Sequence, residues 1–148
     1  MNIKINKVLH KEIDLIQANI KRMADCSFRL KNWYISLITI ALTLLLGQRC
    51  ELSIIALLLL CVTTIFWGLD GFFLRTETLY RWKYEWVIEA RLNENMDNMY
   101  DLNPYNKEMW KDAANKDLCI MKFIFSRTLF PLYGIVWIIA VVVILYII

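Results

Sequence analysis

Apolar residues gather in three runs along the chain, each separated from the next by polar sequence. The runs extend from Trp33 to Gly47, from Leu52 to Phe73 and from Leu129 to Ile148. A helix needs roughly 20 apolar residues to cross a bilayer, and the second and third runs reach that length while the first is somewhat shorter. The pattern predicts an all-α membrane protein with three transmembrane helices, at 33–47, 52–73 and 129–148.

The segment 1–32, ahead of the first run, has a different pattern. Apolar residues such as Leu9, Ile13 and Ile16 recur at intervals of three to five, which places them on one face of a helix. The opposite face carries most of the charged residues, Lys7 and Lys11 among them. We therefore predict an N-terminal amphipathic helix over 1–32, outside the membrane.

The second run is followed by mixed polar and aromatic sequence without a helix-breaking pair. We expect the helix of 52–73 to continue through Arg91 and to end before the stretch from Asn93 to Asn98. The result is one long helix, with its first part in lipid and its second part in water.

The stretch Asp101–Asn106 combines the strongest turn-forming residues of the chain, including Pro104. We expect another helix to start near Lys107 and to run into the third span, where Pro131 bends it or marks its true start. Segment 74–128 would then be a helical stalk, a hairpin that continues spans two and three.

Basic residues predict the orientation in the membrane. Segment 1–32 holds seven Lys and Arg residues and segment 74–128 holds nine, whereas the turn at 48–51 holds one. Because basic residues remain on the cytoplasmic side, both longer segments and the N-terminus are expected there. The C-terminus is then expected on the other side of the membrane.

Composition agrees with a membrane protein and argues against several kinds of chemistry. Hydrophobic residues make up 59% of the 148 residues, and the net charge is +3. The four cysteines have no paired spacing and His10 is the only histidine, so no metal site is predicted. No nucleophile motif or glycine-rich phosphate loop is present, so we predict neither a catalytic residue nor a cofactor.

Three hydroxyl residues share one face of the first span. Ser36, Thr39 and Thr43 follow each other by three and four residues, among leucines and isoleucines. Small residues allow membrane helices to pack closely, so the default interpretation is a packing seam against Thr64, Gly68 and Gly71 of span two. The alternative is the lining of a polar path, which would require several copies of the chain.

Asp70 is the only charged residue in the second span. A carboxylate in hydrocarbon is costly unless it is paired, so Asp70 could line an ion path. We favour a structural role near the end of the span, in an ion pair with Arg75, Arg29 or Lys31.

Aromatic and charged residues alternate between Tyr80 and Trp86. Aromatic rings beside cationic groups hold single-stranded nucleic acid by stacking and by neutralising phosphates, although this pattern also fits an interface belt or a helical core. With the lysines of segment 1–32, it gives a set of candidate contacts to phosphates or bases. These are Lys4, Lys7, Lys11, Lys21, Arg22, Arg81, Trp82, Lys83 and Tyr84.

Two stretches resemble a known family. The chain reads Ser27-Phe28-Arg29-Leu30-Lys31-Asn32-Trp33 before the first span and Phe66-Trp67-Gly68-Leu69-Asp70 with Leu74-Arg75-Thr76-Glu77 at the end of the second. This resembles small bacterial membrane proteins encoded beside nucleotidyltransferases in anti-phage loci, the Hailong-type membrane subunits in particular. Cys26 stands where the family has Asn, and Gly71 where a small or aromatic residue is usual.

The resemblance, which covers about a third of the chain, implies a function. Members of this family are inner-membrane effectors that form tetrameric channels, and their ligand is an oligonucleotide or cyclic nucleotide made by the neighbouring nucleotidyltransferase. Breaching the membrane kills the infected cell before the phage matures, which is abortive infection. The expected partners are therefore membrane lipid, further copies of the chain, the nucleotide ligand and that enzyme.

Two other functions remain compatible with the sequence. One is a membrane scaffold that recruits a soluble partner through its cytoplasmic helices and conducts no ions. The other is a small transporter subunit, for which Asp70 lies too close to the end of its span.

Overall fold

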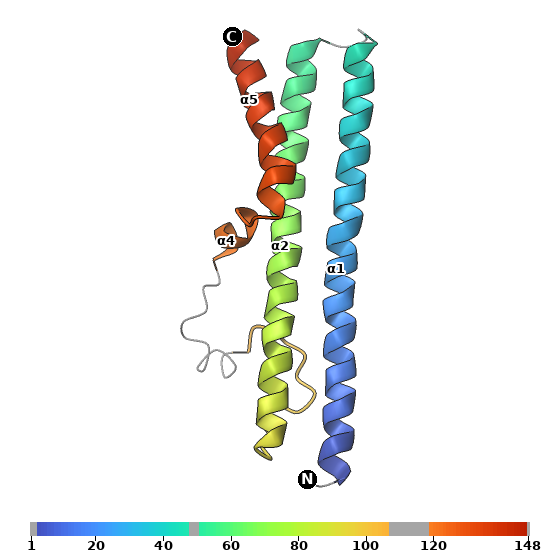
Figure 1. The fold of residues 1–148 in the computed structure, drawn as a ribbon, viewed down its shortest axis with the longest axis vertical. Coiled ribbons are helices and arrows are strands. Elements are labelled where there is room, and N and C mark those ends of the chain that lie inside the picture. The colour runs from blue at the N-terminus through green and yellow to red at the C-terminus, as the bar shows by residue number, and fades with distance from the viewer. Residues whose placement is uncertain (1–2, 48–50, 107–118, 148) are drawn as a thin grey trace. The chain divides into compact units, whose positions relative to one another are not determined.

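The computed structural model describes residues 3–47, 51–106 and 119–147. In these ranges every regular element is helical, and three of the helices are long and apolar enough to span a membrane. The prediction of an all-α fold is thus confirmed for the described residues, and the three apolar helices agree with a membrane location. The elements in chain order are α1 (Ile3–Leu46), α2 (Leu52–Leu92), α4 (Ile120–Ile124), the π-helix η1 (Phe130–Gly134) and α5 (Ile135–Ile147) (Figure 1).

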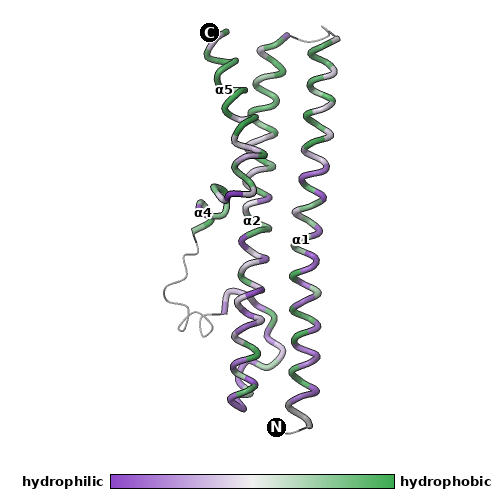
Figure 2. Tube along the Cα trace, viewed as in Figure 1, coloured by the Kyte–Doolittle hydropathy of each residue, from purple (hydrophilic) through white to green (hydrophobic). Residues whose placement is uncertain are grey.

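Helices α1 and α2 each combine a polar part with an apolar part. Hydrophobic residues dominate the end of α1, the start of α2 and all of α5 (Figure 2). Helix α2 passes Phe73 without a break and ends at Leu92, just ahead of Asn93, as predicted. The apolar run and the polar segment that follows it therefore form one helix of 41 residues.

The chain divides into two compact units, and both long helices contribute to each. The first unit comprises 1–25 and 74–118, as far as these residues are described. Its core is formed where α1 and α2 pack together through Leu9, Ile16, Tyr80 and Val87. Ile13, Ile20 and Trp86 pack around this cluster and extend it.

The second unit comprises 26–73 and 119–148, as far as these residues are described, and it contains the apolar parts of α1 and α2 together with the third candidate span, Phe130–Ile147. Few of its side chains are buried, and most of its large apolar residues are exposed. Ile40, for example, is 57% exposed and Val142 58%. An apolar surface of this kind is stable when it faces lipid, which agrees with a location in a membrane.

The predicted helix into the third span is not continuous, which corrects the sequence analysis. Helix α4 ends at Ile124, and turns occupy residues 125–128 before the chain becomes helical again. The Ser126 side chain accepts a hydrogen bond from the Leu129 N–H (3.4 Å), and its carbonyl accepts one from Phe130 (3.0 Å). Pro131 lacks an N–H, so it fits only in the first turn of a new helix. Residues 107–118 of the predicted helix lie outside the described residues.

The loop after α2 contains the predicted turn. The Asp101 carboxylate accepts the Asn103 N–H (2.8 Å), and the Asn103 side chain accepts the Tyr105 N–H (3.0 Å). Upstream, Glu94, Asn98 and Tyr100 have left-handed backbone conformations with φ between 53° and 59°. For residues other than glycine such conformations need support from neighbouring contacts.

Candidate functional site

A buried carboxylate lies at the centre of a polar cluster in the second unit. Asp70 of α2 has no exposed surface and accepts hydrogen bonds from three side chains. The Lys31 ammonium lies 2.8 Å from one carboxylate oxygen and 3.0 Å from the other, and the Tyr133 hydroxyl donates at 3.0 Å. The Ser27 hydroxyl also donates to Asp70 and accepts a hydrogen bond from Lys31.

The cluster continues through aromatic side chains. Tyr34 is fully buried, its hydroxyl is 3.1 Å from the Thr63 hydroxyl, and its ring centre is 4.6 Å from that of Tyr133. Residues of α1, α2 and η1 therefore meet around Asp70. We name Ser27, Lys31, Asp70 and Tyr133 the Asp70 cluster.

The Asp70 cluster agrees with the structural role that the sequence favoured. Lys31, one of the three predicted partners, makes the ion pair and neutralises the carboxylate. Its side chain is 30% exposed, so it can reach past the apolar surface toward water. The contributions of Ser27 and Tyr133 were not predicted, because they depend on how the helices pack.

The three hydroxyl residues of the first span are exposed on α1. Each hydroxyl donates to the carbonyl four residues earlier: Ser36 to Asn32 (2.9 Å), Thr39 to Ile35 (2.9 Å) and Thr43 to Thr39 (2.8 Å). The hydroxyl protons are thus satisfied within the helix, whereas the oxygens remain available on the surface. In a single chain this face makes no packing seam within the described residues.

The small residues of α2 have other neighbours. The Thr64 hydroxyl accepts a hydrogen bond from the Trp137 indole of α5 (3.2 Å). A Cβ atom at Gly71 would lie 2.7 Å from the Ile124 side chain, so the glycine permits the approach of α4. The small residues of the two spans therefore do not pack against each other.

One pocket between the spans of a single chain is apolar. A pocket of about 250 Å³ lies among α1, α2 and α5. Its lining residues are Ile38, Leu42, Leu45, Leu52, Ile55, Ala56, Leu59, Val136, Ile139, Ala140 and Val143. This lining offers no polar group to a hydrated ion.

Most of the predicted ligand contacts on α1 are exposed. Lys7, Lys11, Lys21 and Arg22 all belong to the first unit and have accessible side chains. The Lys11 ammonium lies 5.8 Å from the centre of the Tyr100 ring, and Arg22 donates to Asn19 at 2.9 Å. The side chain of Lys4 lies outside the described part of the structure.

Two of the predicted contacts on α2 meet at one place. Arg81 and Tyr84 line a surface pocket of about 370 Å³ together with Gln17, Ile20 and Glu85. Arg81 also makes an exposed ion pair with Glu77 at 2.6 Å. Trp82 is half-buried and does not line this pocket.

Lys83 was predicted to contact a ligand phosphate, but the structure places its side chain inside the fold with partners of its own. Its side chain is fully buried, donates to the Asn103 carbonyl (2.7 Å) and pairs with Asp101 (3.3 Å). Leu79 and Val87 lie four residues to either side on the same helix and are buried as well. This spacing is the signal in the sequence that places Lys83 on the inner face of α2.

A second buried ion pair joins α1, α2 and the following loop. Arg91 contacts both carboxylate oxygens of Glu12, at 2.8 and 2.9 Å, and neither side chain is appreciably exposed. The same carboxylate accepts the Tyr100 N–H (2.7 Å), and Arg91 also donates to the carbonyls of Asn95 and Asp97. Sequence reasoning missed both partners, although Arg91 follows Val87 by four residues.

Burial and pairing shift the pKa values of these groups. Burial alone raises the pKa of Glu12, but the hydrogen bonds from Arg91 and Tyr100 outweigh it and leave the pKa below its ordinary value of 4.5. Burial lowers the pKa of Lys83, and the nearby Asp101 carboxylate offsets only part of this effect. Burial also raises the pKa of Asp101, but hydrogen bonds from Asn103 and Asn106 and the Lys83 charge bring it below its ordinary value.

Comparison with known proteins provides no family assignment. No family model, curated protein sequence or solved structure matches the chain. The candidate site therefore rests on the chemistry of its own residues.

Proposed function

We propose that the protein forms a homo-oligomeric ion channel in the inner membrane of a bacterium. A nucleotide or oligonucleotide bound on the cytoplasmic side controls it, and its conduction ends the life of an infected cell as an anti-phage defence. The N-terminus is cytoplasmic and the C-terminus periplasmic, as the distribution of basic residues indicates.

The exposed hydroxyl face of α1 is the observation that supports this proposal most directly. Ser36, Thr39 and Thr43 are exposed in a span whose other exposed residues are mostly large and apolar. The pocket between the spans of one chain has an apolar lining, so it offers no alternative route. Copies of α1 arranged around an axis would bring these hydroxyls to a water-filled path, and the resemblance makes a tetramer the expected assembly.

The ligand part of the proposal rests on the accessible cations of the first unit. Lys7, Lys11, Lys21 and Arg22 are available for phosphates, and Arg81 lies beside Tyr84 at a surface pocket. Neutralisation of phosphates makes affinity fall steeply with added salt. A neighbouring nucleotidyltransferase is the proposed source of the ligand.

Depolarisation of the inner membrane is the test of the channel. The protein is expressed in a bacterium, once alone and once with the neighbouring enzyme, and the membrane potential is followed with a potential-sensitive dye. We expect depolarisation in at least one of the two conditions. Changing Ser36, Thr39 and Thr43 together to leucine should abolish the signal, because bulky apolar side chains exclude water from the path.

A control triple variant separates the path from the general surface of the helix. Ile35, Ile40 and Leu44 are also exposed on α1, and their exchange for valine should leave depolarisation unchanged. Equal loss in both variants, or no ion flux with or without the enzyme, would argue for a membrane scaffold instead.

A further inference from the structure

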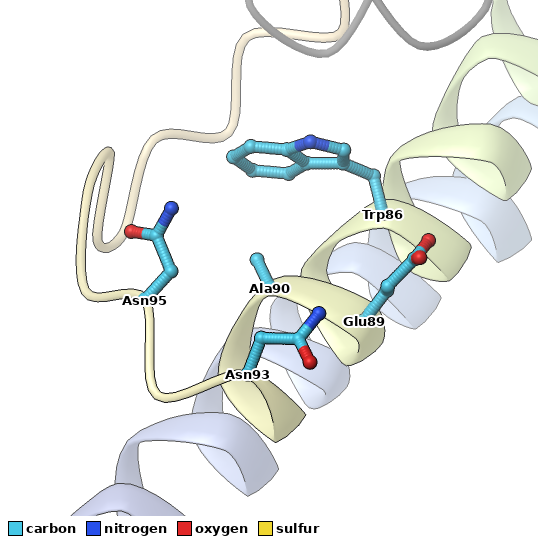
Figure 3. Close-up of a pocket in the computed structure, with 5 residues that line it drawn as sticks. All are labelled: Trp86, Glu89, Ala90, Asn93 and Asn95. Carbon is cyan, nitrogen blue, oxygen red and sulfur yellow. The ribbon is translucent and has the colours of Figure 1, made fainter.

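The end of α2 and the loop after it form a small pocket in the first unit. Its volume is about 170 Å³, and it is lined by Trp86, Glu89, Ala90, Asn93 and Asn95 (Figure 3). Figure 3 shows the Trp86 indole and Asn95 on opposite sides, with Ala90 between them. Drug-sized ligands occupy pockets of about 300 Å³ or more, so this one suits a single ring system.

The indole of Trp86 provides a fixed flat wall. Trp86 packs against the core formed by Leu9, Ile16, Tyr80 and Val87, and is half-buried. A ring that enters the pocket can therefore stack on an aromatic surface that is already held in place.

Asn95 presents a hydrogen-bond donor to the same space. The side-chain oxygen of Asn95 accepts the Asp97 N–H at 2.7 Å. Its backbone N–H donates to the Ala90 carbonyl (2.9 Å), and its backbone carbonyl accepts a hydrogen bond from Arg91. With the oxygen engaged, the amide nitrogen is the polar atom left for a ligand, and it lies on the side of Trp86 in Figure 3.

Glu89 at the rim provides the complementary acceptor. No lysine or arginine lines the pocket, so a phosphate, which offers only acceptors, would meet a carboxylate without a balancing cation. A guanidinium offers only donors and would leave the Asn95 nitrogen without a partner. The ligand that fits is flat, uncharged, and carries a donor on one edge and an acceptor on another, because Glu89 and Asn95 lie on opposite sides of Ala90 in Figure 3.

We propose that this pocket binds a nucleobase, stacked on Trp86 and hydrogen-bonded to Asn95 and Glu89. The inference deepens the proposed function, on which the nucleotide nature of the ligand rests. Adenine and cytosine each carry an amino group that can donate to Glu89 and, on another edge of the base, an acceptor for the Asn95 nitrogen. Uracil places its only edge N–H between two carbonyl oxygens that repel a carboxylate, so uracil binds more weakly.

Nucleosides, which carry no phosphate, test the pocket apart from the lysines. Binding of adenosine, cytidine and uridine to the full chain in detergent micelles would be measured by saturation-transfer NMR. We expect adenosine and cytidine to bind, with Trp86→Leu and Asn95→Asp each weakening them at least tenfold. Asn95→Asp retains the oxygen that accepts the Asp97 N–H, so the loop should remain intact.

Two further variants complete the test. Tyr105→Leu removes an exposed aromatic ring of the same unit outside the pocket and should leave nucleoside binding unchanged. Glu89→Gln should remove the preference for adenosine and cytidine over uridine. Thermal unfolding of each variant shows whether it retains the fold.

The outcomes separate this inference from the channel. Binding that depends on Trp86, without any ion flux, supports the pocket and overturns the proposed function. Absence of nucleoside binding to the unmodified chain, binding undiminished in Trp86→Leu, or binding of a blocked arginine derivative in place of nucleosides overturns the pocket, whatever the conductance.

Discussion

Each unit of this protein contains a buried carboxylate paired with a cation, and the two pairs are built differently. Glu12 faces Arg91, which is completely buried and contacts both carboxylate oxygens. Asp70 faces Lys31, which is 30% exposed, and receives hydroxyl groups from Ser27 and Tyr133 as well. In both cases the pair joins α1 to α2.

The difference shows what each pair supports. Arg91 binds the carbonyls of Asn95 and Asp97, and Glu12 binds the Tyr100 N–H, so this pair orders a loop that has three left-handed residues. The Asp70 cluster consists only of side chains and keeps one carboxylate hydrogen-bonded among apolar helices. Backbone order depends on the first pair, and helix packing on the second.

Loss of Arg91 should have the largest effect. Arg91→Met leaves the Glu12 carboxylate buried without its cation and releases two loop carbonyls, so we expect local stability to fall by about 3–5 kcal/mol. Amide hydrogen exchange in residues 93–101 would show the effect as much faster exchange. Arg22→Met, at an exposed arginine of α1, is the matched control. Equal exchange in the two variants would remove the proposed role of the pair in the loop.

Loss of Lys31 should cost less. In Lys31→Met the Asp70 carboxylate still receives the hydroxyls of Ser27 and Tyr133, so we expect a destabilisation of about 1–3 kcal/mol. The apparent melting temperature in detergent micelles measures it, with Arg29→Met, an exposed neighbour, as the control. If Lys31→Met destabilised the protein more than Arg91→Met, the Asp70 pair would contribute more to stability than the Glu12 pair, contrary to this prediction.

Acid should weaken the loop through Glu12. Because the pKa of Glu12 lies below its ordinary value of 4.5 in the folded chain, its contribution to stability is complete above that value. As the pH falls, Glu12 is protonated in the unfolded chain before it is protonated in the folded chain. Its contribution to stability therefore decreases, and it is lost once the pH has fallen through the folded pKa. Calorimetric unfolding at several pH values should show this loss, and Glu12→Gln should reduce the slope. An unchanged slope would assign the acid sensitivity to other carboxylates.

The exposed pair between Arg81 and Glu77 should have the smallest effect on stability. Water screens such pairs, so Arg81→Gln should change the free energy of unfolding by at most about 0.5 kcal/mol. If Arg81 contacts a phosphate, the same variant should weaken oligonucleotide binding and reduce its salt dependence. Binding of a labelled oligonucleotide at several salt concentrations measures both, and unchanged binding would remove Arg81 from the ligand site.

Much of the fold could be predicted from local sequence. The apolar runs give the three spans, and the absence of a breaking pair after Phe73 gives the continuous α2. Lys31 could be named as one of three candidate partners of Asp70, with Arg75 and Arg29, because a basic side chain near the end of a span can reach inward or toward water. The proposed oligomer, its ligand and the division into 1–32, 33–73, 74–128 and 129–148 stay predictions.

The parts that could not be predicted depend on contacts between distant residues. Lys83 lies among aromatic and charged residues that are typical of a ligand site, but the loop after α2 binds its ammonium group through Asp101 and Asn103. Tyr133 reaches Asp70 from a helix that restarts after Ser126, where a continuous helix was expected. A chemically versatile residue can thus serve the fold or a ligand, and only the packing decides between them.

Gly71 also has a consequence for genetics. Gly71 lets the α2 backbone lie close to Ile124, since a Cβ atom at this position would lie 2.7 Å from the Ile124 side chain. A single methyl group at position 71 therefore acts as a wedge between α2 and α4 and alters no charge. Such a substitution is the natural starting point for a conditional allele, in which temperature decides whether the two helices close together.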